Sequence, residues 1–483
     1  MSYSVAQNTT FLTAASIFQR MISFAYFIFI ARMIGVENTG QYFFAIAFTA
    51  VFTVVADFGL NLVLTREAAR SDKDFETYAS TIFWSKVVFG ILSYGLVVLF
   101  ANLLGYSINL KHLIYLSGIT MFLDNIHSLF YSLFRARKNL LFEAAGIIGS
   151  QFLTLVIGSM ALIRHLPLYW LILAYAIPSA CNVLYVAISA RLKLGVKIRW
   201  QWNKEIGWLF LGTAIPFALA GIINRLYSYS DSILMSKLLT PAELGLWSLP
   251  YKINFAFQFI PAALTASIYP AMSALFVTDR EQIGVLFVKA WRYLLLIVLP
   301  IAFGLWAVGE QVIVKLAGQA YLPSVPVLKI LLVSLILSFL SFVTGATLNA
   351  INKQKVQTIL LAISLVVSVT MNLVLLPIIG IWGAAITASL SNLILTGGGI
   401  IMVRRNVVIR WRMILDYLWR ILLSAVVMGG MAYLLVQKIS FVIVIPVGGV
   451  IYFVLLFWTR AITKELLLSI IKKTKIENSN HVV

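Results

Sequence analysis

The chain has 483 residues, of which 61% are hydrophobic and 11% charged, and its mean hydropathy is +0.96. These values exclude a soluble globular protein. The formal net charge of +20 is explained by membrane topology and by contact with anionic lipid headgroups, so we expect membrane lipids and no nucleic acid as partners.

The apolar runs predict an all-α polytopic membrane protein. They reach the about 20 residues that a spanning helix needs and are too long for barrel strands. Fourteen spans are predicted, at 9–34, 40–65, 78–104, 109–134, 143–163, 168–190, 206–236, 242–276, 286–314, 323–351, 355–378, 380–402, 414–436 and 440–459. Three prolines, Pro250, Pro261 and Pro270, predict a kinked eighth span.

One stretch of the chain occurs twice, since residues 15–40 align without a gap on residues 220–245. The polar matches are Gln19 with Asn224, Arg20 with Arg225, Ser23 with Ser228, Arg32 with Lys237, and Gly40 with Gly245. The first copy lies in span 1 and the second in span 7, six spans later. An even number of membrane crossings separates them, so both copies should have the same orientation. We therefore expect lobes at 1–195 and 196–412, two extra helices at 413–460, and a tail at 461–483 that begins with an amphipathic basic pattern.

The distribution of Lys and Arg predicts the orientation. If the N-terminus is cytoplasmic, most cations outside the spans fall on the cytoplasmic side, and the opposite side carries Arg32, Lys111, Arg164, Lys237, Lys315 and Lys438. Cytoplasmic loops carry the excess of Lys and Arg. Both termini of this multi-pass protein are thus predicted to be cytoplasmic, in the cell membrane.

Two arginines lie at equivalent places in apolar spans. An arginine near the bilayer centre costs about 2.5–3.5 kcal/mol by insertion scales, and intramembrane charges are functional by default. The planar fork of arginine binds phosphate oxygens bidentately and keeps its charge. Arg20 and Arg225 are therefore predicted to bind an anionic substrate, with Lys252 as a secondary candidate.

Acids also lie within spans, among them Asp57, Asp124 and Asp231. Asp57 and Asp124 are candidate proton or sodium sites for coupling. The alternative is a structural one, in which Asp57, Asp124 or Asp231 forms a buried ion pair with Arg20 or Arg225. The residue one turn after Asp124, His127, could join a proton relay.

Lys86 is another secondary candidate for the cationic surface, but it lies near the start of its span, so we expect its side chain to reach the cytoplasmic interface instead. Asp416 and Arg420 have the i, i+4 spacing of an ordinary ion pair on a helix surface.

Four segments together resemble the Wzx-type polysaccharide flippases: ARMIGVENTGQYFFAIAF (31–48), ADFGLNLVLTREAAR (56–70), LFRARKNLLFEA (133–144) and NLVLLPIIGIWGAAITAS (372–389). This family exports O-antigen and capsule repeat units and shares a superfamily with lipid II flippases and multidrug and toxin extrusion transporters.

The resemblance implies two six-helix lobes around a central cavity that opens alternately to the two sides of the membrane, with spans 1 and 7 lining the cleft. It implies a substrate, an undecaprenyl-diphosphate-linked oligosaccharide for O-antigen, capsule or exopolysaccharide biosynthesis. Relatives of this kind have cationic cavities, a pattern that Arg20 and Arg225 match. Partnership with glycosyltransferases and a polysaccharide polymerase is implied as well.

Two competing functions remain. A multidrug or organic-cation antiporter of the same fold needs acids and aromatic rings, and Asp57 and Asp124 keep this alternative open. An enzyme acting on lipid-linked sugars needs placed catalytic groups or a metal. The loops are short and show no clustered His, Cys or carboxylate spacing, so we expect no enzyme, no metal and no cofactor.

Overall fold

The computed structural model describes residues 5–70 and 74–462. Within these residues the chain forms α-helices and one short 3₁₀ turn, without a β-strand, which confirms the predicted all-α class. The amphipathic pattern predicted after Arg460 lies almost entirely outside the described residues.

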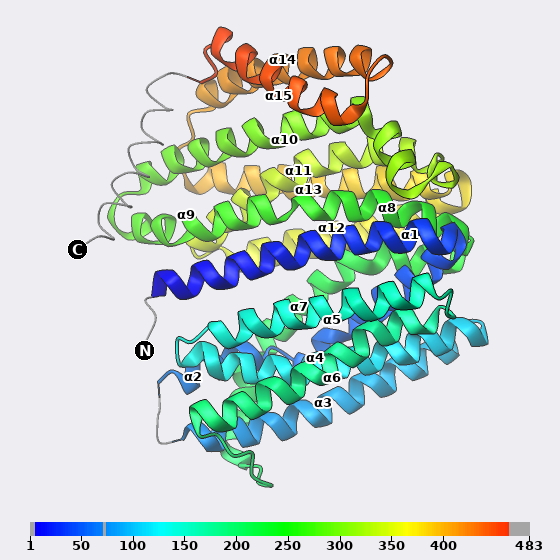
Figure 1. Ribbon diagram of the computed structural model, residues 1–483. Coiled ribbons are helices and arrows are strands. Elements are labelled where there is room, and N and C mark those ends of the chain that lie inside the picture. The colour runs from blue at the N-terminus through cyan, green and yellow to red at the C-terminus, as the bar shows by residue number, and fades with distance from the viewer. Residues whose placement is uncertain (1–4, 71–73, 463–483) are drawn as a thin grey trace. The chain divides into compact units, whose positions relative to one another are not determined.

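The helices follow one another through short connections (Figure 1). Their bounds are α1 Val5–Asp57, α2 Leu60–Ala68, α3 Phe75–Leu103, α4 Ile108–Ala136, α5 Leu141–Ile163, α6 Tyr169–Leu194, α7 Lys204–Leu238, α8 Pro241–Phe257, α9 Phe259–Thr278, α10 Arg280–Ala317, α11 Ser324–Ala350, α12 Gln354–Ile379, α13 Ile381–Asn406, α14 Trp411–Val436 and α15 Phe441–Trp458.

The helix α1 makes two passes. Its backbone leaves the helical region at Gly35, where φ is 78° and ψ is 174°. Phe27 and Phe43, at equal distances along the chain from Gly35, have ring centroids 6.4 Å apart, so the chain turns back there. A positive φ of this kind favours glycine, because other residues have a Cβ that clashes. Within residues 5–70 and 74–462, thirteen stretches are long and apolar enough to span a membrane, and the reversal in the first of them gives fourteen passes.

The second pass ends earlier than predicted. The predicted span 40–65 is interrupted after Asp57, because Phe58 and Gly59 have φ values of 47° and 75° and α2 starts only at Leu60. Gly59 lies against α7, where an added Cβ would lie 3.2 Å from the carbonyl oxygen of Ala214. This close approach explains the turn and places Asp57 at the end of a helix.

The predicted kink in the eighth span is present. The helix α8 ends at Phe257 and α9 begins at Phe259. Pro261 has no N–H to donate to the carbonyl of Phe257, so the ladder of helical hydrogen bonds is interrupted at this point.

The helices group into two compact units. Unit 1 comprises Met1–Ala256 with Leu361–Ala384, and unit 2 comprises Phe257–Leu360 with Ala385–Val483. The units reflect spatial proximity, whereas the lobe boundaries at 195 and 412 follow the sequence repeat. Those boundaries stay a prediction.

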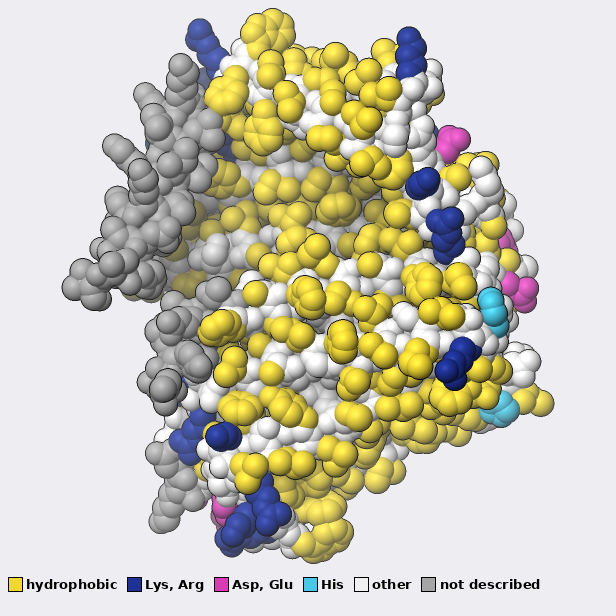
Figure 2. Space-filling view, viewed as in Figure 1, with side chains coloured by type: hydrophobic (Ala, Val, Ile, Leu, Met, Phe, Trp, Pro, Cys, Tyr) yellow, Lys and Arg dark blue, Asp and Glu magenta, His cyan; other side chains and the backbone are white. Residues whose placement is uncertain are grey.

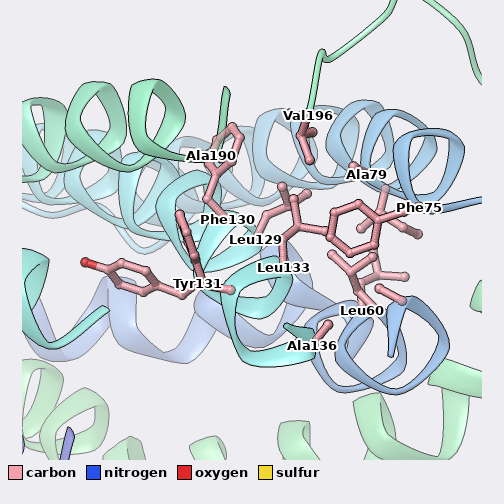
Figure 3. Close-up of a cluster of buried hydrophobic side chains, with 14 of the residues drawn as sticks. Leu60, Phe75, Ala79, Leu129, Phe130, Tyr131, Leu133, Ala136, Ala190 and Val196 are labelled. Carbon is pink, nitrogen blue, oxygen red and sulfur yellow. The ribbon is translucent and has the colours of Figure 1, made fainter. Parts of the chain in front are cut away.

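The core of unit 1 is shown in Figure 3. Leu129, Phe130 and Leu133 of α4 pack against Leu60 of α2 and Phe75 of α3. Apolar burial drives helix association only weakly in a bilayer, so close packing and interhelical hydrogen bonds hold such helices together. This core positions α2, α3 and α4, which carry the polar groups described below.

In unit 2, α10 packs against α14 and α15. Ala307 and Val312 of α10 lie in one buried cluster with Ala432 of α14 and Val444 of α15. Small residues permit this contact, since an added Cβ on Gly429 would lie 3.2 Å from the carbonyl oxygen of Phe303.

The surface is that expected for a membrane protein. In Figure 2, hydrophobic side chains cover most of the face in view, and the visible charged side chains lie near its left and right margins. Exposed apolar residues are normal where lipid is the solvent, because lipid tails are as apolar as leucine.

Candidate functional site

A cavity of about 310 Å³ lies within unit 1, between α1, α4, α6, α7 and α8. Its polar wall includes hydroxyl groups of Tyr42, Thr49, Thr53, Tyr175, Tyr229 and Tyr251. Two charged residues also line it, Lys252 and Asp124. The volume lies near the lower end of the about 300–1,000 Å³ range of small-molecule sites.

Lys252 projects from α8 into this cavity. Its Nζ lies 5.2 Å from the centroid of the Phe27 ring. The neighbouring Tyr251 is held by an edge contact with Phe43, at 5.7 Å between centroids, and donates a hydrogen bond of 3.3 Å to the carbonyl oxygen of Ser228. Among the described residues, no carboxylate forms an ion pair with Lys252. The ammonium is therefore available to an anion in the cavity.

Arg20 borders the same cavity. Its side chain is exposed, and its guanidinium carbon lies 5.9 Å from the ring centroid of Phe255, a lining residue. One helical turn further along α1, Ser23 lines the cavity, and residues at i and i+3 share a helix face. In residues 5–70 and 74–462 no carboxylate pairs with Arg20.

Arg225 lies in the corresponding place on α7. It is half-buried, and Tyr229, one turn later on the same face, lines the cavity. Asp231, one of the possible ion-pair partners, instead accepts hydrogen bonds from Ser368 at 3.1 Å and Asn372 at 2.6 Å. The described part of the chain offers Arg225 no ion pair. Both repeated arginines thus flank the cavity that Lys252 lines.

The two copies of the repeat also contact each other. A Cβ added to Gly40 would collide with the carbonyl oxygen of Pro241, and one added to Gly245 would collide with the carbonyl oxygen of Val36. In the alignment, Gly40 matches Gly245 and Val36 matches Pro241. The contact is therefore reciprocal, as in a self-complementary interface around a two-fold axis, and it requires glycine at both places.

The structure separates Asp57 from the arginines. Asp57 pairs with Lys86 at 2.9 Å, and the same ammonium donates to Asn61 Oδ1 at 2.8 Å, to the carbonyl of Asn125 at 2.9 Å and to Ser128 Oγ at 3.0 Å. The Lys86 side chain is 0% exposed. The prediction that Lys86 reaches the interface is wrong, because these four acceptors hold its ammonium inside unit 1.

Asp124 lines the cavity and is hydrogen-bonded from two helices. Its Oδ1 lies 3.1 Å from His127 Nε2, and Ser179 Oγ of α6 donates to it at 2.6 Å. It forms no ion pair with Arg20. A coupling role for Asp57 or Asp124 stays a prediction.

Aromatic side chains were predicted less well. Of the sugar-stacking candidates, Tyr229 lines the cavity, whereas Tyr26 and Trp247 are buried, at 1% and 0% exposed. Tyr42, Tyr175 and Tyr251, which line the cavity, were not singled out. In the sequence they look like any tyrosine of an apolar helix, and only their neighbours from other helices place them at a cavity.

The described residues contain no group of three or more His, Cys, Asp or Glu side chains that could hold a metal ion. The site is therefore built from hydroxyls, aromatic rings and isolated charges. Its cations favour an anionic ligand, and its hydroxyls can bond a sugar or a phosphate.

A family of proteins described as polysaccharide biosynthesis proteins matches residues 5–276. This is more than half of the chain. The chain belongs to this family. The matched segment contains Arg20, Arg225 and Lys252, so the candidate cations lie in the part of the chain that defines the family.

Among characterised proteins, this family member is similar to the probable low-salt glycan biosynthesis flippase Agl15 of Haloferax volcanii. The two are 21% identical over 393 residues, which cover 80% of this chain and 81% of Agl15.

The fold is shared with solved transporters. The lipid II flippase MurJ, in an inward closed conformation, superposes with a TM-score of 0.76 at 16% identity, covering 93% of this chain and 98% of MurJ. An inward-facing multidrug resistance MATE transporter of the MOP superfamily gives 0.68 at 14% identity, with 80% and 94% covered. These matches confirm the predicted fold.

Proposed function

We propose that this protein is a flippase for lipid-linked glycans. It would turn undecaprenyl-diphosphate-linked oligosaccharide repeat units from the cytoplasmic to the outer leaflet, for O-antigen, capsule or exopolysaccharide biosynthesis. Membership of the polysaccharide biosynthesis family supports this, as do the similarity to Agl15, described as a glycan biosynthesis flippase, and the fold shared with MurJ, a lipid II flippase.

The observation that carries the proposal is the set of cations without carboxylate partners in the described part of unit 1. Arg20, Arg225 and Lys252 come from α1, α7 and α8 and lie at or beside one cavity. At an effective dielectric near 20, a pair of unit charges 4 Å apart is worth about 4 kcal/mol. Such cations bind a diphosphate firmly yet reversibly, and two arginine forks can grip its oxygens bidentately.

The cavity size supports transport by alternating access. An oligosaccharide with a diphosphate is larger than the drug-sized ligands that fill about 300–1,000 Å³, whereas the cavity holds about 310 Å³. The substrate must therefore bind to a conformation of the protein in which the cavity is wider. The reciprocal packing at Gly40 and Gly245 is the contact between the two repeat copies that we propose separates when unit 1 opens toward the outer leaflet.

For coupling, Asp124 is the better placed of the two acids. It lines the cavity, whereas Asp57 is already neutralised by Lys86. We propose both termini to be cytoplasmic in the cell membrane, on the distribution of Lys and Arg.

A second candidate function rests on Asp124. An organic cation could bind its carboxylate among the rings of Tyr42, Tyr175 and Tyr229, which line the same cavity. A multidrug or organic-cation antiporter would use this arrangement. The positive charge of Lys252 would then repel the cationic substrate.

Ligand-dependent stability of the purified protein discriminates between the two. A short-chain polyprenyl diphosphate sugar at 100 times its Kd should add about 2.7 kcal/mol of stability, and a lipophilic organic cation should add none. Arg20→Gln combined with Arg225→Gln should abolish the diphosphate effect. Arg404→Gln with Arg405→Gln removes two exposed cations of α13 and should preserve it. Stabilisation by the organic cation alone, lost in Asp124→Asn, would establish the antiporter instead.

A further inference from the structure

A second and larger cavity, of about 700 Å³, lies within unit 2. Its walls come from α9, α10, the residues before α14 and the first turns of α14. Close packing shapes it, because a Cβ on Gly284 of α10 would collide with the carbonyl oxygen of Val408. All of its lining residues belong to unit 2, so the cavity is separate from the candidate substrate site of unit 1.

The charges at this cavity are mostly positive. Lys289 and Arg292 lie one turn apart on α10, and Arg410 is the N-cap residue of α14. Among the residues that the structure describes, Glu281 is the one carboxylate that lines the cavity. Lys289 and Arg410 are exposed and form no ion pair among the described residues. Three cations against one acid attract an anion.

Arg292 supplies a second and independent indication. It donates through Nη2 to the carbonyl oxygen of Ala461, and its guanidinium lies 4.0 Å from the ring centroid of Tyr417. Its Nε is buried and has no hydrogen-bond partner among residues 5–70 and 74–462. A buried donor left unsatisfied costs about 1–3 kcal/mol, more when charged, so an anionic oxygen bound here would remove that cost.

The start of α14 adds to the positive electrostatic potential at this cavity. No described side chain caps this helix N-terminus, and its positive dipole end favours an anion. Lys289 lies about 14 Å along α10 from its first residue, at 1.5 Å per residue. The cations thus lie near the helix ends that the positive-inside distribution assigns to the cytoplasmic side.

The rest of the lining is apolar. Leu264 and Ile268 of α9, Val285 of α10 and Met413 of α14 face the same cavity, and Val285 and Met413 are exposed. A free phosphate would leave this surface unused. A ligand with an anionic headgroup and an acyl chain would contact both parts.

We propose that this cavity binds a membrane phospholipid with an anionic headgroup from the cytoplasmic leaflet. The headgroup phosphate contacts Lys289, Arg292 and Arg410, and an acyl chain lies against α9 and α14. Basic pockets between transmembrane helices bind such headgroups. The site is independent of the substrate proposed above, since it would hold a resident lipid and needs no glycan.

The test compares two lipids of equal acyl length, phosphatidylglycerol and phosphatidylcholine. The full-length protein in mild detergent is titrated with each, and bound lipid is counted by native mass spectrometry. Phosphatidylglycerol should bind more tightly to the wild type. Lys289→Gln with Arg410→Gln should weaken phosphatidylglycerol about tenfold or more, from about 1 kcal/mol per cation, and should leave phosphatidylcholine unchanged. The melting temperature of the variant checks that the exposed substitutions leave the fold intact.

Two controls separate this site from other basic surfaces. Arg404→Gln with Arg405→Gln removes the same charge from α13, and Lys472→Gln, Lys473→Gln and Lys475→Gln remove charge from the end of the chain. Both should bind phosphatidylglycerol as the wild type does. Equal binding of the two lipids, unchanged binding in the Lys289/Arg410 variant, equal loss in either control, or full displacement by inorganic phosphate alone would each overturn the proposal.

Discussion

Unit 1 contains two kinds of intramembrane cation, and they differ in what surrounds them. Lys86 is fully buried, with Asp57 and three neutral oxygens around its ammonium. Arg20, Arg225 and Lys252 lie at or beside a cavity and pair with no carboxylate in the described residues. In the sequence both kinds are single basic residues in apolar helices. Their surroundings make the first a structural ion pair, and we propose that the second binds a ligand.

The difference has a physical cause. Burying a charge costs several kcal/mol unless an opposite charge and hydrogen bonds compensate for the lost water. Lys86 has this compensation. Arg20 is exposed and Arg225 is half-buried, so these two cavity cations carry less of this cost.

The largest effect is expected when the buried pair is broken. Lys86→Met should lower the free energy of unfolding by about 3 kcal/mol, because Asp57, 33% exposed, loses its partner. Thermal unfolding in detergent measures this. Lys438→Met, at an exposed lysine, is the control and should change stability by about 0.5 kcal/mol or less. Adding Asp57→Asn to Lys86→Met should restore part of the loss. If Lys86→Met and Lys438→Met unfold with equal free energies, Lys86 is not structural.

The reciprocal glycine contact tests whether the two copies of the repeat, and with them Arg20 and Arg225, are held together. Gly40→Ala and Gly245→Ala should each destabilise by about 1–3 kcal/mol, the usual cost of overpacking, because the new Cβ meets a backbone carbonyl. Gly149→Ala is the matched control, since a Cβ there meets nothing within 4 Å. It should be neutral or stabilising. If thermal unfolding gives the three variants the same stability, the glycine contact is contradicted.

Removing the cavity cations should affect stability little. Arg20→Gln with Arg225→Gln should change the free energy of unfolding by about 1 kcal/mol or less, since no ion pair to a described residue is lost. Flipping of a fluorescent lipid-linked sugar in proteoliposomes should fall about tenfold or more, as expected when one to two kcal/mol of phosphate binding is removed. If the double variant instead unfolds readily, and the fraction that stays folded still transports, Arg20 and Arg225 are structural and do not bind substrate.

The smallest effect is expected at an exposed pair. Arg420 and Asp416 on α14 lie 2.9 Å apart, as the i, i+4 spacing predicted, and the Asp416 side chain is 46% exposed. Asp416→Asn should cost about 0.3–0.5 kcal/mol, typical of a helix surface pair. A cost near that of Lys86→Met, in the same unfolding assay, would show that exposure does not separate the two pairs.

Much of the fold was predictable because bilayer physics acts on local sequence. Spanning helices need long apolar runs, and their order follows the chain. The kink near Pro261 follows from a missing N–H, and the turn at Gly35 falls between two predicted spans. The interruption at Phe58 and Gly59 was missed, since it depends on the close approach of α7.

The site was predictable in part. The repeat identified Arg20 and Arg225, which lie beside the cavity, and Lys252, which lines it. The hydroxyls of Tyr42, Tyr175 and Tyr251 were missed, because a cavity exists only between helices that are distant in the chain. The position of Lys86 near a predicted span end indicated an interfacial lysine, and this was wrong for the same reason.

The all-α class, the spans and the duplicated arginines follow from composition, periodicity and alignment, all of which are local properties of the chain. The tertiary structure decided which group each charged side chain meets. Asp57 meets Lys86 of α3, Asp124 meets Ser179 of α6, and Asp231 meets Asn372 of α12. An ion pair or hydrogen bond acts over a few ångströms, so it depends on which distant helices pack together, and residue order along one helix does not reveal that.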